Sequence, residues 1–163
     1  MPDLRLYWDS CVFLEYINGD DQTRLQEISA ILEDAEKNKL RIMTSTLTVA
    51  EVAFARYEQA GAALDPVAQA KIDALWAMGG PVRLADVTPL VAEAGRDLIR
   101  LGLPKQPDQW RLKPADAMHL ATAKSLQADT VHTYDPKWAK YETIIGIPIG
   151  EPMSANPQLG FST

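Results

Sequence analysis

The sequence is poor in the residues that form covalent cross-links and zinc sites. Its 163 residues include one cysteine, Cys11, and two histidines, His119 and His132. A single cysteine excludes an internal disulfide and fits a reducing compartment. So small a supply of thiol and imidazole ligands also disfavours zinc. We expect Cys11 to be a small buried residue and both histidines to be packed or hydrogen-bonded, with a role in a site as the alternative for His119.

Long apolar runs and an excess of basic residues are also missing. No run approaches the roughly 18–20 apolar residues that a membrane-spanning helix needs. The stretch MPDLRLYWDS has no basic segment followed by an apolar block, as a secretory signal would. We therefore expect a cytoplasmic protein without a membrane partner. The net charge of −6 argues against a protein that coats nucleic acid non-specifically, but not against an enzyme that cuts it.

Short apolar segments alternate with helical patterns along the whole chain. The expected strands are 4–8, 40–45, 82–87, 130–134 and 143–149, and the expected helices are 10–17, 22–39, 46–61, 66–78, 89–101 and a helix that begins at Pro114. Nearly continuous apolar strands that alternate with helices are typical of a parallel sheet covered on both faces. The sequence therefore predicts an α/β fold: a three-layer α/β/α sandwich with a central, mainly parallel five-stranded sheet.

The length and composition favour one soluble domain. A chain of 163 residues, 47% hydrophobic and 23% charged, is long enough for one real core and short for two. We assign residues 1–149 to a single domain and residues 150–163 to a C-terminal extension. The prolines and asparagine of this extension predict that it is loosely held.

Four acidic residues occupy corresponding places around the expected sheet. Asp9 follows the first strand and Asp135 follows the fourth, while Glu51 lies about two turns into the helix after the second strand. Asp116 lies in the first turn of the helix that leads into the fourth strand. Ligand sites of parallel sheets lie beyond the carboxyl ends of the strands, and a helix that precedes a strand begins near that edge. We therefore expect the four carboxylates to converge.

Each acid also has a purely structural interpretation. Asp9 could cap the helix that follows it, Asp116 could complement a helix dipole, and Asp135 could serve a turn. Glu51 could be a solvated helix residue, although its neighbours are apolar and a carboxylate among them is costly unless paired. All four structural interpretations would have to hold together for the pattern to be accidental.

The order and context of these acids resemble the PIN domain family. The matching motifs are Asp9 after the first strand, Glu51 in TSTLTVAEV, Asp116 in ADAMHLATA and Asp135 in VHTYD. Ser10, directly after the first acid, and Thr133, two residues before the last, also fit the family pattern. The branch that the chain most resembles is that of the VapC-type ribonuclease toxins of bacterial toxin–antitoxin pairs. The resemblance covers residues 4–149, and the loop 103–113 and the tail after Gly150 depart from it by their length.

The four acids suit a hard divalent cation, Mg²⁺ or Mn²⁺, because such ions prefer oxygen ligands. We predict that Asp9, Asp116 and Asp135 bind the metal directly or through water, and that Glu51 binds it or orients a water. Clustered carboxylates repel one another, so we expect the metal-free site to be strained or partly protonated. Bound metal would activate a water for attack on a phosphate. The resemblance also implies products with 5′-phosphate and 3′-hydroxyl ends.

Basic and aromatic residues flank the last two acids in the sequence. Phosphate contacts are predicted for the cations and base stacking for the tryptophans, with solvated cations and partly buried rings as the alternative. The cations are Arg111, Lys113 and Lys137, with Lys105 and Lys140 nearby, and the aromatic residues are Trp110 and Trp138.

The function predicted from the acids and the resemblance is a metal-dependent endoribonuclease, the toxin of a type II toxin–antitoxin pair. The resemblance implies an RNA substrate, a cognate antitoxin and a homodimer, and apolar stripes on helices 22–39 and 47–60 are the expected groove for the antitoxin. The alternatives are a non-toxin PIN nuclease of RNA processing and a non-catalytic PIN module that binds RNA or protein. A phosphatase with Asp9 as nucleophile is disfavoured, because position 11 holds cysteine where a second acid is wanted.

Overall fold

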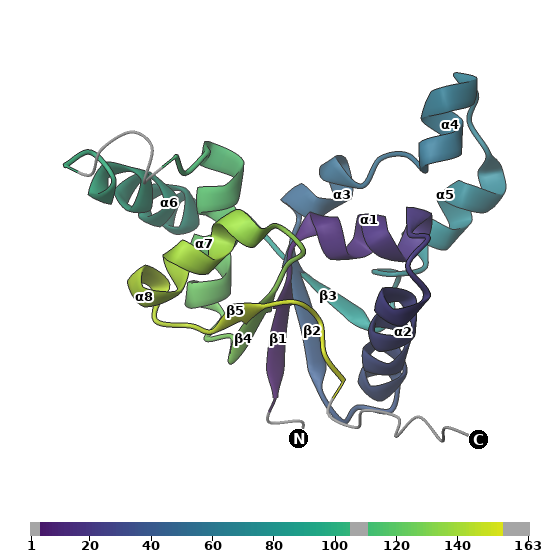
Figure 1. Cartoon of the computed structure of the whole chain (residues 1–163), viewed down its shortest axis with the longest axis horizontal. Helices are drawn as coiled ribbons and strands as arrows, with labels where there is room; N and C mark the ends of the chain where they lie inside the picture. Colours follow the sequence, from purple (N-terminus) through teal and green to yellow (C-terminus); the bar gives the residue numbers. More distant parts are fainter. Residues whose placement is uncertain (1–3, 105–110, 155–163) are drawn as a thin grey trace.

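Five parallel strands form the centre of the computed structural model, which describes residues 4–104 and 111–154. The strands are β1 (Arg5–Trp8), β2 (Arg41–Ser45), β3 (Val82–Ala85), β4 (Thr130–His132) and β5 (Ile149–Gly150). They lie in the order β3-β2-β1-β4-β5, and each neighbouring pair is parallel (Figure 1). The predicted five-stranded parallel sheet is confirmed.

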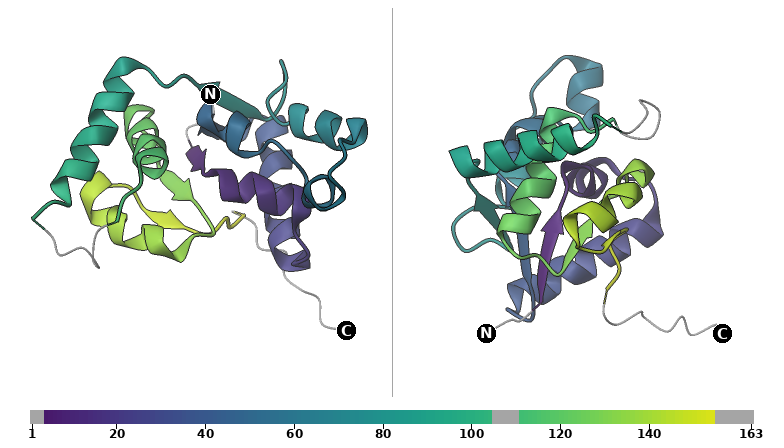
Figure 2. Two further views of the ribbon diagram at one scale, coloured as in Figure 1. Left: turned by 90° about the horizontal axis from the view of Figure 1, so that it is seen from above. Right: turned by 90° about the vertical axis from the view of Figure 1, so that its left-hand side faces the viewer.

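Helices cover both faces of this sheet, as the two further views also show (Figure 2). One face carries α1 (Ser10–Asn18), α2 (Gln22–Glu36) and α5 (Pro66–Asp73), and the other carries α6 (Pro89–Leu101), α7 (Pro114–Ser125), the 3₁₀ helix η1 (Pro136–Tyr141) and α8 (Glu142–Ile145). Tyr7 of β1 packs in one core cluster with Leu120, whereas Leu6 and Trp8 pack in the other with Ile28. Successive side chains of a strand point to opposite faces, so β1 serves both cores. The predicted α/β/α sandwich is confirmed.

The predicted single helix over 46–61 is wrong, because two helices, α3 (Leu47–Glu51) and α4 (Arg56–Gly61), occupy this segment. Two side chains bind the amides at the start of α4. Glu58 Oε2 accepts the Ala55 N–H at 2.8 Å, and Asn18 Oδ1 accepts the Arg56 N–H at 2.8 Å. Because side chains accept these two N–H groups, the amides need no hydrogen bond to the carbonyls of a preceding helical turn, and a new helix can begin here. The break leaves Glu51 as the last residue of a short helix directly after β2.

The predicted strand over 143–149 is also largely wrong. Residues 142–145 form α8, which ends at Gly146 with a φ of 72°, a conformation that favours glycine. Ile145 is buried in the core, so the apolar residues of this segment serve a helix face instead of a strand. Only Ile149 and Gly150 pair with β4. Two predicted helices, 22–39 and 66–78, end earlier than expected, whereas 89–101 matches α6.

The first residues of the predicted extension lie against α2. Glu151 forms an ion pair with Arg24 at 3.3 Å, and the Ser154 N–H donates to Glu27 Oε2. Pro152 is buried. This part of the extension is therefore held, contrary to expectation, and residues 155–163 lie outside the described residues. Within the described ranges, no helix combines the length and the apolar character that crossing a membrane requires.

Both edge strands of the sheet are short and begin directly after a proline. Strand β3 has four residues and follows Pro81, and strand β5 has two residues and follows Pro148. Proline has no N–H to donate to a strand ladder. Hydrogen bonding along each edge is therefore confined to a few residues.

Helix α6 packs closely against the start of α7 at Gly95. Gly95 is buried, and a Cβ at this position would lie 3.4 Å from the backbone carbon of Ala117 and from Met118. The contact fixes the first turns of α7, which carry Asp116 and His119. A small residue in the middle of α6 therefore helps to position two side chains of the candidate site.

We predict that Gly95→Ala leaves the free energy of unfolding within about 1 kcal/mol of the wild type, since better helix propensity offsets a tight but ordinary contact. Gly95→Leu is expected to lower it by roughly 1–3 kcal/mol, because the larger side chain must push α7 away. Urea unfolding followed by circular dichroism measures both values. Equal stability of the leucine and alanine variants would contradict this account of the α6–α7 contact.

Candidate active site

Side chains from three elements meet at the carboxyl ends of β1 and β2. One ligand atom each from Asp9, Glu51 and His119 lies within 4.8 Å of the others. Asp9 follows β1, Glu51 ends α3 after β2, and His119 lies one turn into α7. Parallel strands bring distant parts of the chain together in this way, because their carboxyl ends share one edge of the sheet.

Asp9 is buried and hydrogen-bonded through both carboxylate oxygens. Only 6% of the residue is exposed. Oδ1 accepts the Ser10 N–H at 2.8 Å, and Oδ2 accepts the Thr133 hydroxyl at 3.1 Å and the Cys11 thiol at 3.1 Å. Asp9 thus caps α1, as the structural interpretation held, and also lies among the acids. The structure places Ser10 and Thr133 directly against it.

Cys11 differs from the small buried hydrophobic residue that we expected. Its side chain is half-buried and polar in its contacts, because it donates to Asp9 and accepts the Tyr134 N–H at 3.2 Å. Burial first, and the charge of Asp9 second, raise the pKa of the Cys11 thiol to about 12. Cys11 therefore remains a neutral thiol at physiological pH and serves as a hydrogen-bond donor to the carboxylate.

Glu51 and His119 form the shortest polar contact of the cluster. His119 Nε2 lies 2.7 Å from Glu51 Oε2, and His119 is 1% exposed whereas the Glu51 side chain is 31% exposed. Burial raises the pKa of Glu51, but hydrogen bonds from His119 and then from Ser10 outweigh it. The pKa of Glu51 therefore lies below its usual value, and the side chain is a carboxylate at neutral pH.

His119 and Tyr7 are more closely involved in the site than the sequence indicated. We expected His119 to be packed or hydrogen-bonded, and the structure shows both together with proximity to the acids. Tyr7 was not a candidate, yet its hydroxyl lies 2.7 Å from His119 Nδ1. The spacing of three residues from Asp116 is the available signal for His119. No sequence signal marks Tyr7, because its context is that of an ordinary strand residue.

Asp116 and Asp135 lie at the same edge but outside the tight cluster of the described residues. Burial first, and the charge of Asp9 second, raise the pKa of Asp116, with a further contribution from Asp135. Asp135 Oδ1 accepts the Lys137 N–H at 2.9 Å, and its own N–H donates to Thr133 Oγ1 at 3.0 Å. Asp135 thus also caps η1. The raised pKa of Asp116 agrees with the expected repulsion among metal-free carboxylates.

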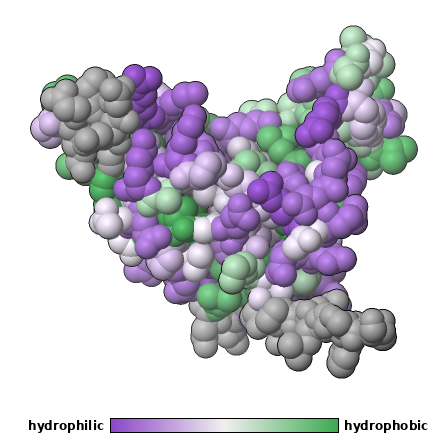
Figure 3. Space-filling view, in the orientation of Figure 1, coloured by the Kyte–Doolittle hydropathy of each residue, from purple (hydrophilic) through white to green (hydrophobic). Residues whose placement is uncertain are grey.

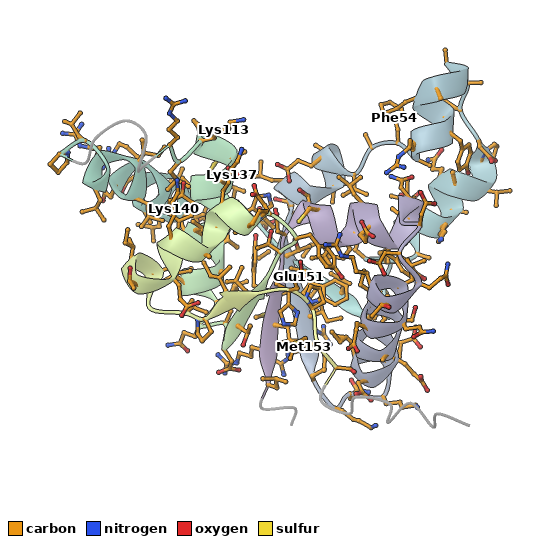
Figure 4. All side chains as sticks on the ribbon, viewed as in Figure 1. Phe54, Lys113, Lys137, Lys140, Glu151 and Met153 are labelled. Atoms are coloured by element: carbon orange, nitrogen blue, oxygen red, sulfur yellow. The ribbon has the colours of Figure 1, made fainter. Side chains whose placement is uncertain are left out.

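The predicted RNA-binding residues differ in their surroundings. Lys113 at the start of α7 and Lys137 after Asp135 are exposed and lie on the same side of the molecule (Figure 4), and Arg111 is exposed as well. Lys140 is also exposed and lies over the ring of Tyr141. Lys105 and Trp110 lie outside the described residues. Base stacking by Trp138 is wrong, because this residue is 1% exposed and part of the core.

A comparison with protein families agrees with this geometry. The family model of the PIN domain matches residues 6–144. Because the match covers most of the 163 residues, the chain belongs to the PIN domain family. No curated protein matches the sequence significantly.

Solved structures of proteins with 14–18% sequence identity share this fold. VapBC2 of Rickettsia felis, solved with a fragment of promoter DNA, has a TM-score of 0.62 at 17% identity and covers 90% of this chain and 97% of its own. VapC20 of Mycobacterium tuberculosis, a toxin that cleaves the sarcin–ricin loop, has a TM-score of 0.58 at 14% identity, with 82% and 92% covered. FitAcB of Neisseria gonorrhoeae has a TM-score of 0.59 at 18% identity, with 90% and 97% covered.

We predict that Asp116→Asn stabilises the metal-free protein at neutral pH. A carboxyl group whose pKa is raised by folding contributes stability below its unfolded pKa of 3.8 that is lost as the pH rises through the folded value. Asparagine mimics the protonated acid, so the variant should unfold at a temperature up to about 4 °C higher at pH 7 in EDTA. The difference should shrink toward pH 4. A lower melting temperature at pH 7 would show that the Asp116 charge is stabilising.

Proposed function

We propose that this chain is a metal-dependent endoribonuclease and the toxin of a type II toxin–antitoxin pair. The observation that carries the proposal is the convergence of Asp9 and Glu51 beside Asp116 and Asp135, at the carboxyl edge of a PIN domain sheet. The family consists in general of nucleases, and VapC20, one of the structural neighbours named above, is a toxin that cleaves the sarcin–ricin loop. Four separate structural roles would not explain why four acids lie at one edge of the sheet, whereas a metal site would.

The residues at this edge fit a hard divalent cation, Mg²⁺ or Mn²⁺. Asp9, Asp116 and Asp135 would hold it through carboxylate oxygens, and Glu51 would bind it or orient a water. The raised pKa of Asp116 supports this assignment, because burial first and the neighbouring charge of Asp9 second disfavour its ionisation, and a cation would relieve both. When bound, the metal lowers the pKa of a water and neutralises charge on a phosphate. Ser10, Cys11 and Thr133 keep the Asp9 carboxylate oriented by donating to it.

The substrate that suits the surroundings of the acids is an RNA held by its phosphates. Lys113 directly precedes the first turn of α7, Lys137 lies two residues after Asp135, and both are exposed. Exposed cations beside an acidic site can hold the phosphates on either side of the bond that is cut. Arg111, three residues before the start of α7, is placed to extend this path.

The decisive experiment is cleavage of total cellular RNA by the purified protein. We expect discrete cuts with Mg²⁺ or Mn²⁺, none with EDTA, and a loss of at least roughly 100-fold in rate for Asp9→Asn, because a metal ligand is removed. Glu93→Gln, an exposed acid of α6, is the matched control and should cut normally. Cuts that persist in EDTA or in Asp9→Asn would refute the metal-dependent site. A folded protein that never cuts would favour the non-catalytic module.

The antitoxin is proposed to bind a groove that opens beside the acids. Leu14, Asn18, Phe54 and Tyr134 line this groove together with Glu51. Phe54 is 43% exposed, and apolar surface gathers on the α4 and α5 projection and at its base (Figure 3). The predicted stripe on α2 does not line this groove, because most of its apolar residues (Ile28, Ile31, Leu32 and Ala35) are buried in the core. A partner with apolar side chains and a cation for Glu51 would fit.

A growth assay separates a toxin from a non-toxin nuclease. Expression of the chain alone should arrest bacterial growth, and co-expression of a short reading frame directly upstream of its gene should restore growth. Asp9→Asn should be harmless. Phe54→Asp should remain toxic but escape rescue, because a charge in the groove weakens binding of an apolar partner. Normal growth on expression of an RNA-cleaving protein would favour the RNA-processing alternative.

A homodimer is also proposed, on the resemblance and on one surface. Leu90 and Leu101 of α6 are 77% and 54% exposed, and Leu98 and Ala121 line an apolar groove between α6 and α7. A second copy covering this groove would remove these side chains from water, which is favourable in proportion to the apolar area buried.

A further inference from the structure

A chain of buried polar groups leads from the sheet to the Glu51 carboxylate. The Ser45 N–H donates to the Tyr7 hydroxyl oxygen at 3.2 Å, and this hydroxyl lies 2.7 Å from His119 Nδ1. His119 Nε2 then lies 2.7 Å from Glu51 Oε2. Ser45 and Tyr7 are 0% exposed and His119 is 1% exposed. Buried polar groups are costly unless each finds a partner, and here every group has one.

The hydrogen-bonding capacities of these groups favour one proton arrangement. An ionised Glu51 can only accept, so His119 Nε2 must carry a proton and donate it. A neutral ring then has a bare Nδ1, which accepts the single hydroxyl proton of Tyr7. The Tyr7 oxygen keeps a lone pair for the Ser45 N–H. One tautomer of His119 thus satisfies the amide, the hydroxyl, both ring nitrogens and the carboxylate at once.

We propose that His119 is a positioning residue, which holds Glu51 Oε2 through its Nε2–H while Tyr7 fixes the ring. His119 thereby engages only one oxygen of Glu51, Oε2, and leaves Oε1 for contacts with Ser10, the metal or its water. This inference rests on the proposed nuclease function and adds a residue and its tautomer to it. It extends the site from the carboxylates to Tyr7 at the centre of the sheet, so Glu51 is held against a rigid strand although it lies at the end of a short helix.

A competing role for the same nitrogen is direct metal binding, since Nε2 belongs to the cluster of ligand atoms within 4.8 Å. The two roles exclude each other, because a metal ligand must be unprotonated at Nε2. The distances favour the positioning role. Nε2 is 2.7 Å from Glu51 Oε2 but 4.0 Å from Asp9 Oδ1, so the ring faces one carboxylate and does not bridge both.

Nitrogen-15 NMR of the histidine rings tests the proton arrangement without any activity measurement. The chain has only two histidines, so His132 is an internal reference. We expect His119 to be the tautomer protonated at Nε2, both without metal and after saturation with Mg²⁺. The amide signal of Ser10 reports the binding of Mg²⁺. A ring protonated at Nδ1, or loss of the Nε2 proton on Mg²⁺ binding, would overturn the proposal. If Mg²⁺ changes no chemical shift of the Ser10 amide, the result counts against the metal site. The histidine spectrum still shows which tautomer is present.

Three variants test the functional consequence. His119→Leu keeps much of the volume but no donor, and should lower the rate of RNA cleavage roughly 10- to 100-fold, as is common when a group that orients a site residue is lost. His119→Gln retains an N–H at similar reach and should recover much of the rate. Tyr7→Phe removes only the hydroxyl, and should lower the rate less than His119→Leu while allowing the other His119 tautomer to appear in the spectrum.

Thr122→Val is the control, because Thr122 is a buried polar residue of the same helix whose hydroxyl donates to the Met118 carbonyl and not to the site. It should cut RNA at the wild-type rate. Equal losses in His119→Gln and His119→Leu at equal melting temperature would overturn the positioning role, as would full activity of His119→Leu. If His119→Leu fails to fold, the glutamine and Tyr7→Phe variants and the spectrum decide.

Discussion

Asp9 places a carboxylate with only 6% of its surface exposed at the end of the central strand, and a buried charge must be compensated. Its hydrogen-bond donors come from the first turn of α1 and from Thr133 after β4. The need to satisfy one carboxylate therefore ties the first strand, the first helix and the fourth strand into one unit. The other acids of the site take their positions around that unit, and their mutual repulsion is the cost of gathering them there.

Much of the fold could be predicted because its signals are local. Alternation of apolar strands with helices indicates a parallel sheet, and the topology of such a sheet brings Asp9, Glu51, Asp116 and Asp135 to one edge without any knowledge of contacts. The convergence could thus be expected, although the finer arrangement could not. Asp9 and Asp135 each serve a helix end as well as the edge, so the structural interpretations and the site were never true alternatives for these two.

What could not be predicted depends on contacts between distant residues. No proline or glycine marks the break between α3 and α4. One of the two side chains that accept amides at the start of α4, Asn18, lies 38 residues away in the sequence. The apolar residues of 143–149 suit a strand or a helix equally, and only packing against the core decides. The relation of His119 to Glu51 and Tyr7 spans 68 and 112 residues. Within one helical turn, only the spacing of three residues from Asp116 separates this ring from an ordinary core histidine.

The proline before each edge strand has a consequence for how the protein can meet other molecules. An exposed strand edge is a template on which a further strand can add, and such edges promote aggregation. Here one edge offers four residues and the other two, each directly after a residue that cannot donate to the ladder. Extension of the sheet by another chain is therefore poorly supported on both sides. Specific association is left to the helical surfaces, where side chains, and not backbone hydrogen bonds, select the partner.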